Sequence, residues 1–140
     1  MAFCKTTLAC NCLPDLNFFS NSNEKEAIYS SYKDAYDSSS LVAIAKVIQI
    51  DFMEKEYELV VTFELTETIK GDPKRIFHLT TAPTSAGCGY PFKRDQTYIL
   101  YAFEDSDGNY STESCSHTEI LDKTSEEEIA YLRTLKNESK

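Results

Sequence analysis

Residues 41–50 read LVAIAKVIQI and residues 56–66 read EYELVVTFELT, and these two stretches decide the fold. The first is apolar and rich in β-branched side chains, which favours a strand buried along much of its length. The second alternates apolar and polar residues, as a strand does when one face lies on a core and the other in water. Residues 51–55 predict the hairpin connection between them. The apolar face of the second strand is expected to carry Tyr57, Leu59, Val61, Phe63 and Leu65.

Three further strands are expected at residues 75–80, 97–103 and 110–115, and helices at residues 24–37 and 124–135. Five antiparallel strands expose unpaired edges unless the sheet closes on itself or is covered. The expected fold is therefore mainly β with some α content. It is a five-stranded closed Greek-key barrel of the oligonucleotide/oligosaccharide-binding (OB) type, with one N-terminal and one C-terminal flanking helix.

The size and charge of the chain limit its partners. Its 140 residues fit one domain, and its formal net charge is −9. Such an acidic surface repels phosphate backbones and anionic lipid headgroups, so we expect no nucleic-acid partner. No stretch is apolar enough for a transmembrane helix. We expect a monomer without a cofactor that binds another protein.

Five cysteines, at positions 4, 10, 12, 88 and 115, form an even set with one left over. Cys10 and Cys12 are too close to bridge each other without strain. The connectivities that remain send one of them to Cys88 and the other to Cys115. The rival interpretation is a zinc site made by these four thiols. It is disfavoured because neither Cys88 nor Cys115 has a cysteine nearby in the sequence, as zinc ligand pairs do.

The opening residues indicate export. Residues 1–9 read MAFCKTTLA, with small residues at the −3 and −1 positions of a signal-peptidase cut before Cys10. We therefore interpret residues 1–9 as a residual signal-peptide tail, or else a disordered segment, and residues 10–140 as the single domain. The expected location is secreted, either extracellular or periplasmic. The alternative is a lipid anchor on Cys10, because Leu8-Ala9-Cys10 loosely matches a bacterial lipobox.

Several motifs carry a resemblance to a known family. They are Cys10-Asn11-Cys12, Lys70-Gly71, residues 81–89 (TAPTSAGCG), residues 98–102 (YILYA) and Cys115. In this order and spacing they resemble the netrin-like domain, and within it the tissue inhibitors of metalloproteinases. The resemblance implies an OB-type barrel and the disulfides Cys10–Cys88 and Cys12–Cys115. The chain departs from the inhibitors in two ways, since it lacks cysteines for their third disulfide in this domain and lacks their cysteine-rich C-terminal domain.

The resemblance also implies a mechanism. The mature N-terminal Cys10 would chelate the catalytic zinc of a partner protease through its α-amine and its carbonyl oxygen. Asn11 would point toward the specificity pocket, which a small polar side chain fills poorly. Cys10 is thus the one metal-binding residue expected, and only toward zinc held by the partner. The protease-binding residues implied are Cys10, Asn11, Cys12, Leu13, Pro14, Thr84, Ser85, Ala86, Gly87 and Cys88.

The alternative function is a non-inhibitory extracellular or lipid-anchored protein-interaction domain. Neither function is enzymatic, and the sequence offers no better catalytic candidate. A cysteine nucleophile needs a thiolate and a base, and His78 and His117 are surrounded by no metal-ligand triad in the sequence. Two glycosylation acceptor triplets begin at Asn109 and Asn137, and they matter only in a eukaryotic host.

Overall fold

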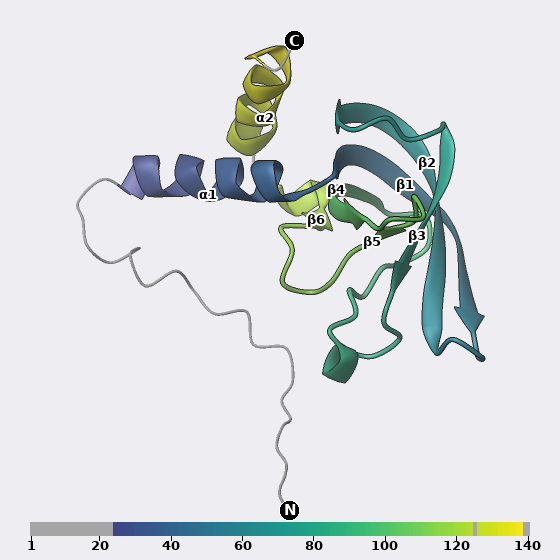
Figure 1. The fold of residues 1–140 in the computed structure, drawn as a ribbon. Coiled ribbons are helices and arrows are strands. Elements are labelled where there is room, and N and C mark those ends of the chain that lie inside the picture. The colour runs from purple at the N-terminus through teal and green to yellow at the C-terminus, as the bar shows by residue number, and fades with distance from the viewer. Residues whose placement is uncertain (1–23, 125, 139–140) are drawn as a thin grey trace, which may run out of the picture.

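Strand β1 (Leu41–Met53) is the strand on which the sheet closes, because it pairs with two neighbours. It is antiparallel to β2 (Glu58–Lys70) along its whole length and to β4 (Thr97–Glu104) along its first half. The structure is a computed structural model that describes residues 24–124 and 126–138. Figure 1 shows the strands curled into a barrel on one side, with the two helices on the other.

The strand order is β1-β2-β3-β5-β4, and β4 pairs back onto β1 to close a five-stranded barrel. Strand β3 is Ile76–Thr81 and β5 is Tyr110–Ser111. The OB-type closed barrel with two flanking helices predicted from the sequence is confirmed. One expectation was wrong, because β3 and β5 run parallel rather than antiparallel. A sixth strand, β6 (Glu119–Ile120), pairs antiparallel with Tyr98 and Ile99 of β4, on the edge opposite β1.

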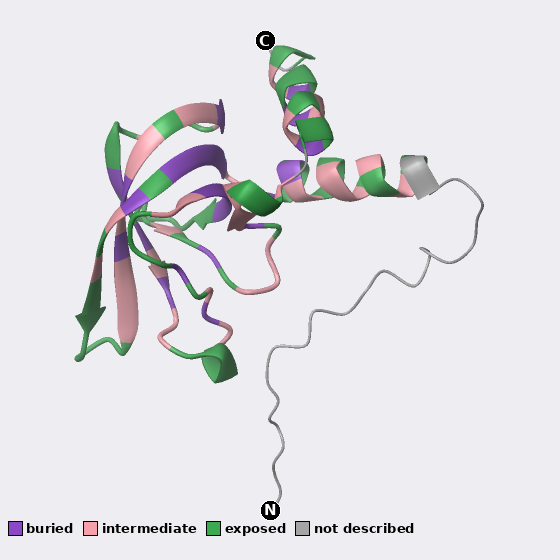
Figure 2. Cartoon of the chain, turned by 180° about the vertical axis from the view of Figure 1, so that it is seen from behind, coloured by how far each residue is buried: buried purple, intermediate pink, exposed green. Residues whose placement is uncertain are grey.

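Burial on both faces explains why the first half of β1 is so apolar. Leu41, Ala43 and Ala45 point into the barrel, while Val42 and Ile44 point out of it and lie under the helices. All five are buried (Figure 2). The second half of β1 pairs only with β2, and its side chains are mostly exposed. The apolar run in the sequence therefore marks where the strand has neighbours on both edges and both faces.

The interior of the barrel is filled by aliphatic side chains and a group of packed aromatic rings. Phe63 stacks on Phe77 with ring centroids 5.5 Å apart, and Phe92 packs edge-on against Phe63 at 5.3 Å. The alternation predicted for β2 is confirmed by the burial of Val61 and Phe63. The buried interior residues are Leu41, Ala43, Ala45, Val47, Val61, Phe63, Phe77, Leu79, Phe92, Tyr98, Leu100 and Ala102.

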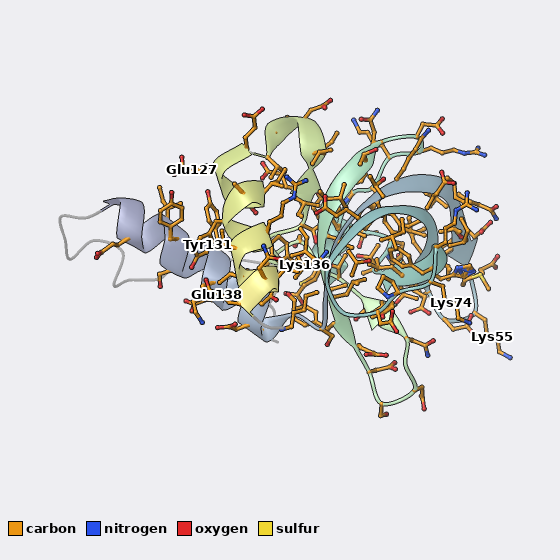
Figure 3. The ribbon with its side chains drawn as sticks, turned by 90° about the horizontal axis from the view of Figure 1, so that it is seen from above. Lys55, Lys74, Glu127, Tyr131, Lys136 and Glu138 are labelled. Atoms are coloured by element: carbon orange, nitrogen blue, oxygen red, sulfur yellow. The ribbon has the colours of Figure 1, made fainter. Side chains whose placement is uncertain are left out.

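Helix α2 (Glu126–Glu138) and the C-terminal end of helix α1 (Glu24–Ser38) lie against the outer face of the barrel, and the rest of α1 projects away from the strands (Figure 1). Tyr131 of α2 is turned toward α1 (Figure 3), where its ring lies 4.9 Å from that of Tyr29. Burial of apolar residues of α2 and of Tyr36 of α1 under this outer face is the main force that holds the helices there. The buried residues of this second cluster are Tyr36, Val42, Ile44, Ile69, Ile99, Tyr101, Leu132 and Leu135.

Polar contacts fix both helices against β2. Arg133 makes two bonds to Glu67, from Nε at 3.0 Å and from Nη2 at 2.7 Å, and this pair lowers the pKa of Glu67. The Nζ of Lys136 donates to the carbonyl of Thr68 at 2.8 Å. Near the C-terminus of α1, Lys70 Nζ donates to the carbonyl of Tyr36 at 2.8 Å. A cation at that end of a helix also suits the helix dipole.

Several boundaries differ from the sequence-based expectation, among them the end of β1 at Met53 rather than residue 50 and the end of β2 at Lys70 rather than residue 66. β2 begins at Glu58 rather than at residue 56, because residues 54–57 form the turn, and Tyr57 ends it with a φ of +53°. Tyr57 is consequently exposed instead of lying on the core face. The fifth strand ends at Ser111 rather than at residue 115, because its continuation bends away into a loop.

Glu128 is a buried carboxylate at the base of α2. It is 5% exposed and accepts a 2.7 Å hydrogen bond from the hydroxyl of Tyr101, which is 1% exposed. Burial raises the pKa of Glu128, and the hydrogen bond from Tyr101 partly opposes that effect. The neutral form of this carboxyl is therefore the better one to bury.

The pH dependence of stability tests this description. Because the pKa of Glu128 is raised in the folded chain, its contribution to stability is full below the unfolded pKa. That contribution is lost as pH rises through the folded pKa. We expect Glu128→Gln, which keeps an acceptor for Tyr101, to raise the free energy of unfolding at pH 7 more than at pH 3, as measured by urea denaturation. Glu126→Gln in the same helical turn is the control for the helix dipole. An equal change at both pH values would contradict the description.

Candidate functional site

The predicted protease-binding residues fall into two groups. Cys10, Asn11, Cys12, Leu13 and Pro14 lie outside the described residues, as do residues 1–9, so the expectations for them stay predictions. The second group, from Thr84 to Cys88, lies in one loop between β3 and β4. Thr84 to Gly87 are exposed and Cys88 is half-buried, as a contact loop requires.

Hydrogen bonds at both ends of the Thr84–Cys88 loop hold its backbone in one conformation. Residues Ser85–Gly87 form a single 3-10 turn, and the Thr84 hydroxyl accepts a bond from the Gly87 N–H. The carbonyl of Thr84 accepts from the N–H of Gly89 at 2.9 Å. Cys88 ends the turn with a φ of +69°, a left-handed conformation that side-chain-bearing residues adopt at a cost. Glycine or asparagine is the usual choice there, so the cysteine indicates that its sulfur is needed at this point.

A second loop, which carries Cys115, is joined to the first. The N–H of Ser114 donates to the carbonyl of Cys88 at 2.9 Å, so the two cysteine-bearing loops lie against each other. Cys88 and Cys115 are both disulfide-bonded. The pairing Cys10–Cys88 and Cys12–Cys115 involves cysteines outside the described residues and stays a prediction. Among the residues described, no group of three or more His, Cys, Asp or Glu side chains could hold a metal ion.

Buried threonines hold the Cys115 loop on the barrel. The Thr112 hydroxyl donates to the carbonyl of Tyr101 at 2.8 Å, and the Thr118 hydroxyl accepts from the N–H of Tyr101 at 2.9 Å. The Thr81 hydroxyl donates to the carbonyl of Thr112 and accepts from the N–H of Tyr90, both at 2.9 Å. These bonds satisfy buried backbone groups where the fifth strand has ended, so the loop is fixed without a regular ladder.

An open pocket of about 280 Å³ lies beside these loops. It is bounded by the start of β2, the end of β3, the Gly87–Cys88 turn and the residues that follow β5. Sequence reasoning identified only the Gly87–Cys88 wall. The lining residues are Tyr57, Glu58, Thr80, Thr81, Ala82, Gly87, Cys88, Ser111, Thr112 and Glu113.

The tip of the β1–β2 hairpin projects at the same end of the barrel as this loop (Figure 1). It carries three exposed apolar side chains, Phe52, Met53 and Tyr57, and Tyr57 is 62% exposed. The rings of Phe52 and Tyr57 pack edge-to-face with centroids 5.9 Å apart. Large apolar side chains gathered at one exposed point are typical of a surface that meets another protein.

Other sequence-based expectations have mixed outcomes. In the strand expected at residues 97–103, Tyr98 and Tyr101 are buried, whereas Phe103 is 37% exposed. Asn109 and Asn137, which begin the two glycosylation triplets, are both exposed. In the described part of the chain, no helix is long and apolar enough to span a membrane. Comparison with protein-family models and with curated proteins finds no match to this chain.

The close approach at Gly89 yields a paired test of the loop. A Cβ at Gly89 would lie 1.9 Å from the carbonyl oxygen of Ala82, whereas a Cβ at Gly87 would lie 3.2 Å from Ala82 Cβ and 3.7 Å from Thr84 Oγ1. We expect Gly89→Ala to lower the free energy of unfolding by about 1–3 kcal/mol, the usual cost of overpacking. Gly87→Ala should cost much less. Equal effects of the two substitutions in urea denaturation would show that the loop does not have this shape.

A count of free thiols tests the disulfides. The 140-residue chain, purified without reductant and then unfolded, should show at most one free thiol, at Cys4. The other four sulfurs are expected to be oxidised in two bridges. Three free thiols would mean that only one bridge forms, and five would mean that no bridge forms.

Proposed function

We propose that the chain is a non-catalytic, netrin-like protein-binding module whose partner contacts one end of the barrel. The observation that carries this proposal is the convergence of three segments at that end. These are the exposed Thr84–Gly87 turn, the apolar hairpin tip at Phe52 and Tyr57, and the loop of Cys115. The Thr84–Gly87 turn and the Cys115 loop are fixed by backbone hydrogen bonds. This lowers the entropic cost of ordering the surface when a partner binds.

The disulfide-bonded state of Cys88 and Cys115 supports a further element of this surface. If their partners are Cys10 and Cys12, as the resemblance implies, the opening residues of the mature chain are attached beside the Thr84–Gly87 turn. Two bridges two residues apart would hold those residues as a stiff projection rather than as a loose tail. Disulfides of this kind are typical of exported proteins, secreted or lipid-anchored at Cys10.

The finer form of the proposal is inhibition of a zinc metalloproteinase. The α-amine of Cys10 has an expected pKa of about 8, so a useful fraction is neutral near physiological pH and can donate to zinc. Zinc binding would draw the amine further toward its neutral form. The exposed Thr84–Gly87 turn would then flank the projection on the protease surface, as it does in the family that the sequence resembles.

A non-inhibitory binding module is the second candidate, and the hairpin tip favours it. Phe52, Met53 and Tyr57 provide an apolar contact that needs no free amine. Asn11 would also fill an apolar specificity pocket poorly. The two candidates therefore differ in one requirement, because only inhibition by chelation needs the mature chain to begin at Cys10.

Inhibition assays against a panel of zinc endopeptidases test the finer form. One version of the chain begins at Cys10, a second keeps Ala9 before it, and a third keeps residues 1–9. We expect the first to inhibit at least one protease and the other two to lose that inhibition, because a peptide bond removes the donor amine. The version with Ala9 is the matched control, since it differs by a single residue.

Each other result has a distinct meaning. Failure of the version that begins at Cys10 against the whole panel would end the inhibitor form and leave the binding module. Equal inhibition by all three versions would exclude zinc chelation by the amine as the mechanism.

A further inference from the structure

The second half of β1 has a sheet edge beside which no strand lies. Strand β4 pairs with β1 only from Leu41 to Lys46, and the last bonds on that side join Val47 to Asp95 and Gln96, both at 2.9 Å. Residues 94–95 form a turn, so the β4 side of the ladder ends there. Beyond Val47, in the hairpin that projects from the barrel (Figure 1), β1 has β2 on one side and, within the described residues, no strand on the other.

The hydrogen bonds of β2 show which backbone groups of β1 point to this open edge. The N–H of Leu65 donates to the carbonyl of Arg75 at 2.8 Å, on the side of β3. Backbone groups alternate between the two neighbours along a strand, so odd-numbered residues of β2 face β3 and even-numbered ones face β1. No register shift interrupts this alternation, because β2 pairs with β3 in unbroken register from Leu59 to Glu64.

Two residues of β1, Ile50 and Phe52, therefore direct their N–H and C=O groups outward. Gln49 and Asp51 lie opposite even-numbered residues of β2 and are the ones that bond to it. In the described part of the chain, no other strand, turn or side chain bonds to the backbone of Ile50 or Phe52. Unpaired donors and acceptors that repeat every roughly 7 Å along an extended backbone are what an added β-strand requires.

The charges beside this edge favour a basic strand over a second copy of the chain. Residues 48–58 contain four carboxylates and one lysine. Asp51 is exposed, and its carboxylate accepts a 2.6 Å bond from the Gln49 amide on the same face. In the antiparallel register that would pair Ile50 with Phe52 of a second copy, Asp51 would lie directly opposite its own counterpart. Like charges in that position are destabilising, whereas a lysine or arginine there is favourable.

The other face of the edge is apolar. Ile50 packs partly against the interior of the barrel, and Phe52 is 51% exposed. Residues directly opposite each other in an antiparallel pair lie on the same face and contact each other. An added strand would thus place two apolar side chains against Ile50 and Phe52, with a basic side chain between them on the face of Asp51.

We propose that the open edge of β1 binds an extended segment of the partner protein as an added antiparallel strand, with the sequence pattern apolar–basic–apolar. The segment would exchange two backbone hydrogen bonds with Ile50 and two with Phe52, and its central lysine or arginine would lie opposite Asp51. The backbone bonds supply affinity and the alternating side chains supply specificity. The inference rests on the proposed protein-binding function and specifies the conformation and charge of the bound segment.

Hydrogen exchange of single amides, followed by NMR on the isotope-labelled full chain, tests the edge. In the free chain we expect slow exchange at Gln49 and Asp51, which donate to β2, and fast exchange at Ile50 and Phe52. The probe is the peptide acetyl-Thr-Val-Lys-Val-Thr-amide. Its binding should slow exchange at Ile50 and Phe52 by roughly tenfold at nine-tenths occupancy, because only the unoccupied fraction exchanges.

Two related peptides separate strand addition from simple attraction of charge. N-methylation of both valines removes the N–H groups that face the edge but keeps the lysine, and this peptide should not bind. Glutamate in place of the lysine should weaken binding. In the chain, Asp51→Asn should weaken binding of the lysine peptide about two- to fivefold, the range for an opposite-charge pair across two strands. Glu126→Gln on α2 should leave it unchanged.

A pair of variants at Phe52 isolates the backbone contribution. Phe52→Ala removes the ring and keeps the outward N–H, whereas Phe52→Pro removes both and leaves the ladder with β2 intact, as proline on a sheet edge does. We expect the proline variant to bind the lysine peptide about fivefold more weakly than the alanine variant, the effect of one lost hydrogen bond. Slow exchange at Gln49 and Asp51 in both variants shows that the hairpin is still formed.

Four results would overturn the inference. Slow exchange at Ile50 and Phe52 in the dilute free chain would mean that another part of the chain covers the edge. Slowing that grows with chain concentration would make a second copy the occupant. Equal binding of the N-methylated peptide, or equal binding by the two Phe52 variants, would exclude strand addition.

The inference and the inhibitor form of the proposed function fail separately. Protease inhibition by the version that begins at Cys10, with no peptide bound at β1, would reject the strand-binding edge alone. Peptide binding at β1 without inhibition of any protease in the panel would reject the inhibitor form alone.

Discussion

The burial of β1 on both faces and both edges is the constraint on which the rest of the structure depends. Between Leu41 and Val47, alternate side chains fill the barrel and support the helices, and the backbone pairs with β2 on one side and β4 on the other. A one-residue shift in register would exchange these two sets of side chains. The small interior-facing residues Ala43 and Ala45 and the larger helix-facing residues Val42 and Ile44 would then be misplaced. The closed sheet and the helix positions are thus determined together by one strand.

Beyond Val47 the same strand loses one neighbour and becomes half of a projecting hairpin. The change coincides with a register irregularity between Val47 and Gln49. Residues of β1 before this irregularity are buried, whereas those after it belong to the exposed hairpin whose tip carries Phe52 and Tyr57. The proposed binding end of the barrel is therefore continuous with β1, the strand that closes the barrel. A rigid scaffold with exposed loops at one end is a common way to position binding residues.

Much of the fold could be predicted from the sequence, because strands and helices differ in the spacing of their apolar residues. The apolar run of β1, the alternation of β2 around Val61 and Phe63 and the two helices are all present, although β1, β2 and α2 each end later than expected. Tyr57 shows where periodicity fails, since it continues the alternation of β2 but lies in a turn with a left-handed backbone. The parallel pairing of β3 with the two-residue β5, and the existence of β6, depend on neighbours distant in the chain.

The candidate site was less predictable for the same reason. The loop from Thr84 to Cys88 was found through its motif, whereas Glu58 and Glu113 come together only because β2 and the residues after β5 meet in space. Neither glutamate has a sequence neighbour that marks it as special. The roles of Thr112 and Thr118 could not be predicted either, because their hydrogen bonds to Tyr101 form only after the chain has folded.

The brevity of β5 has a mechanical consequence. Strand β5 pairs with only two residues of β3, Leu79 and Thr80, and with only two residues of β4, Phe103 and Glu104, so its two ladders are the shortest in the closed barrel. The chain leaves this seam on both sides through segments that contain Cys88 and Cys115. The two disulfide-bonded cysteines therefore lie in the segments that follow the weakest strand pairing of the barrel. A partner protein that bound at this place would stabilise that pairing.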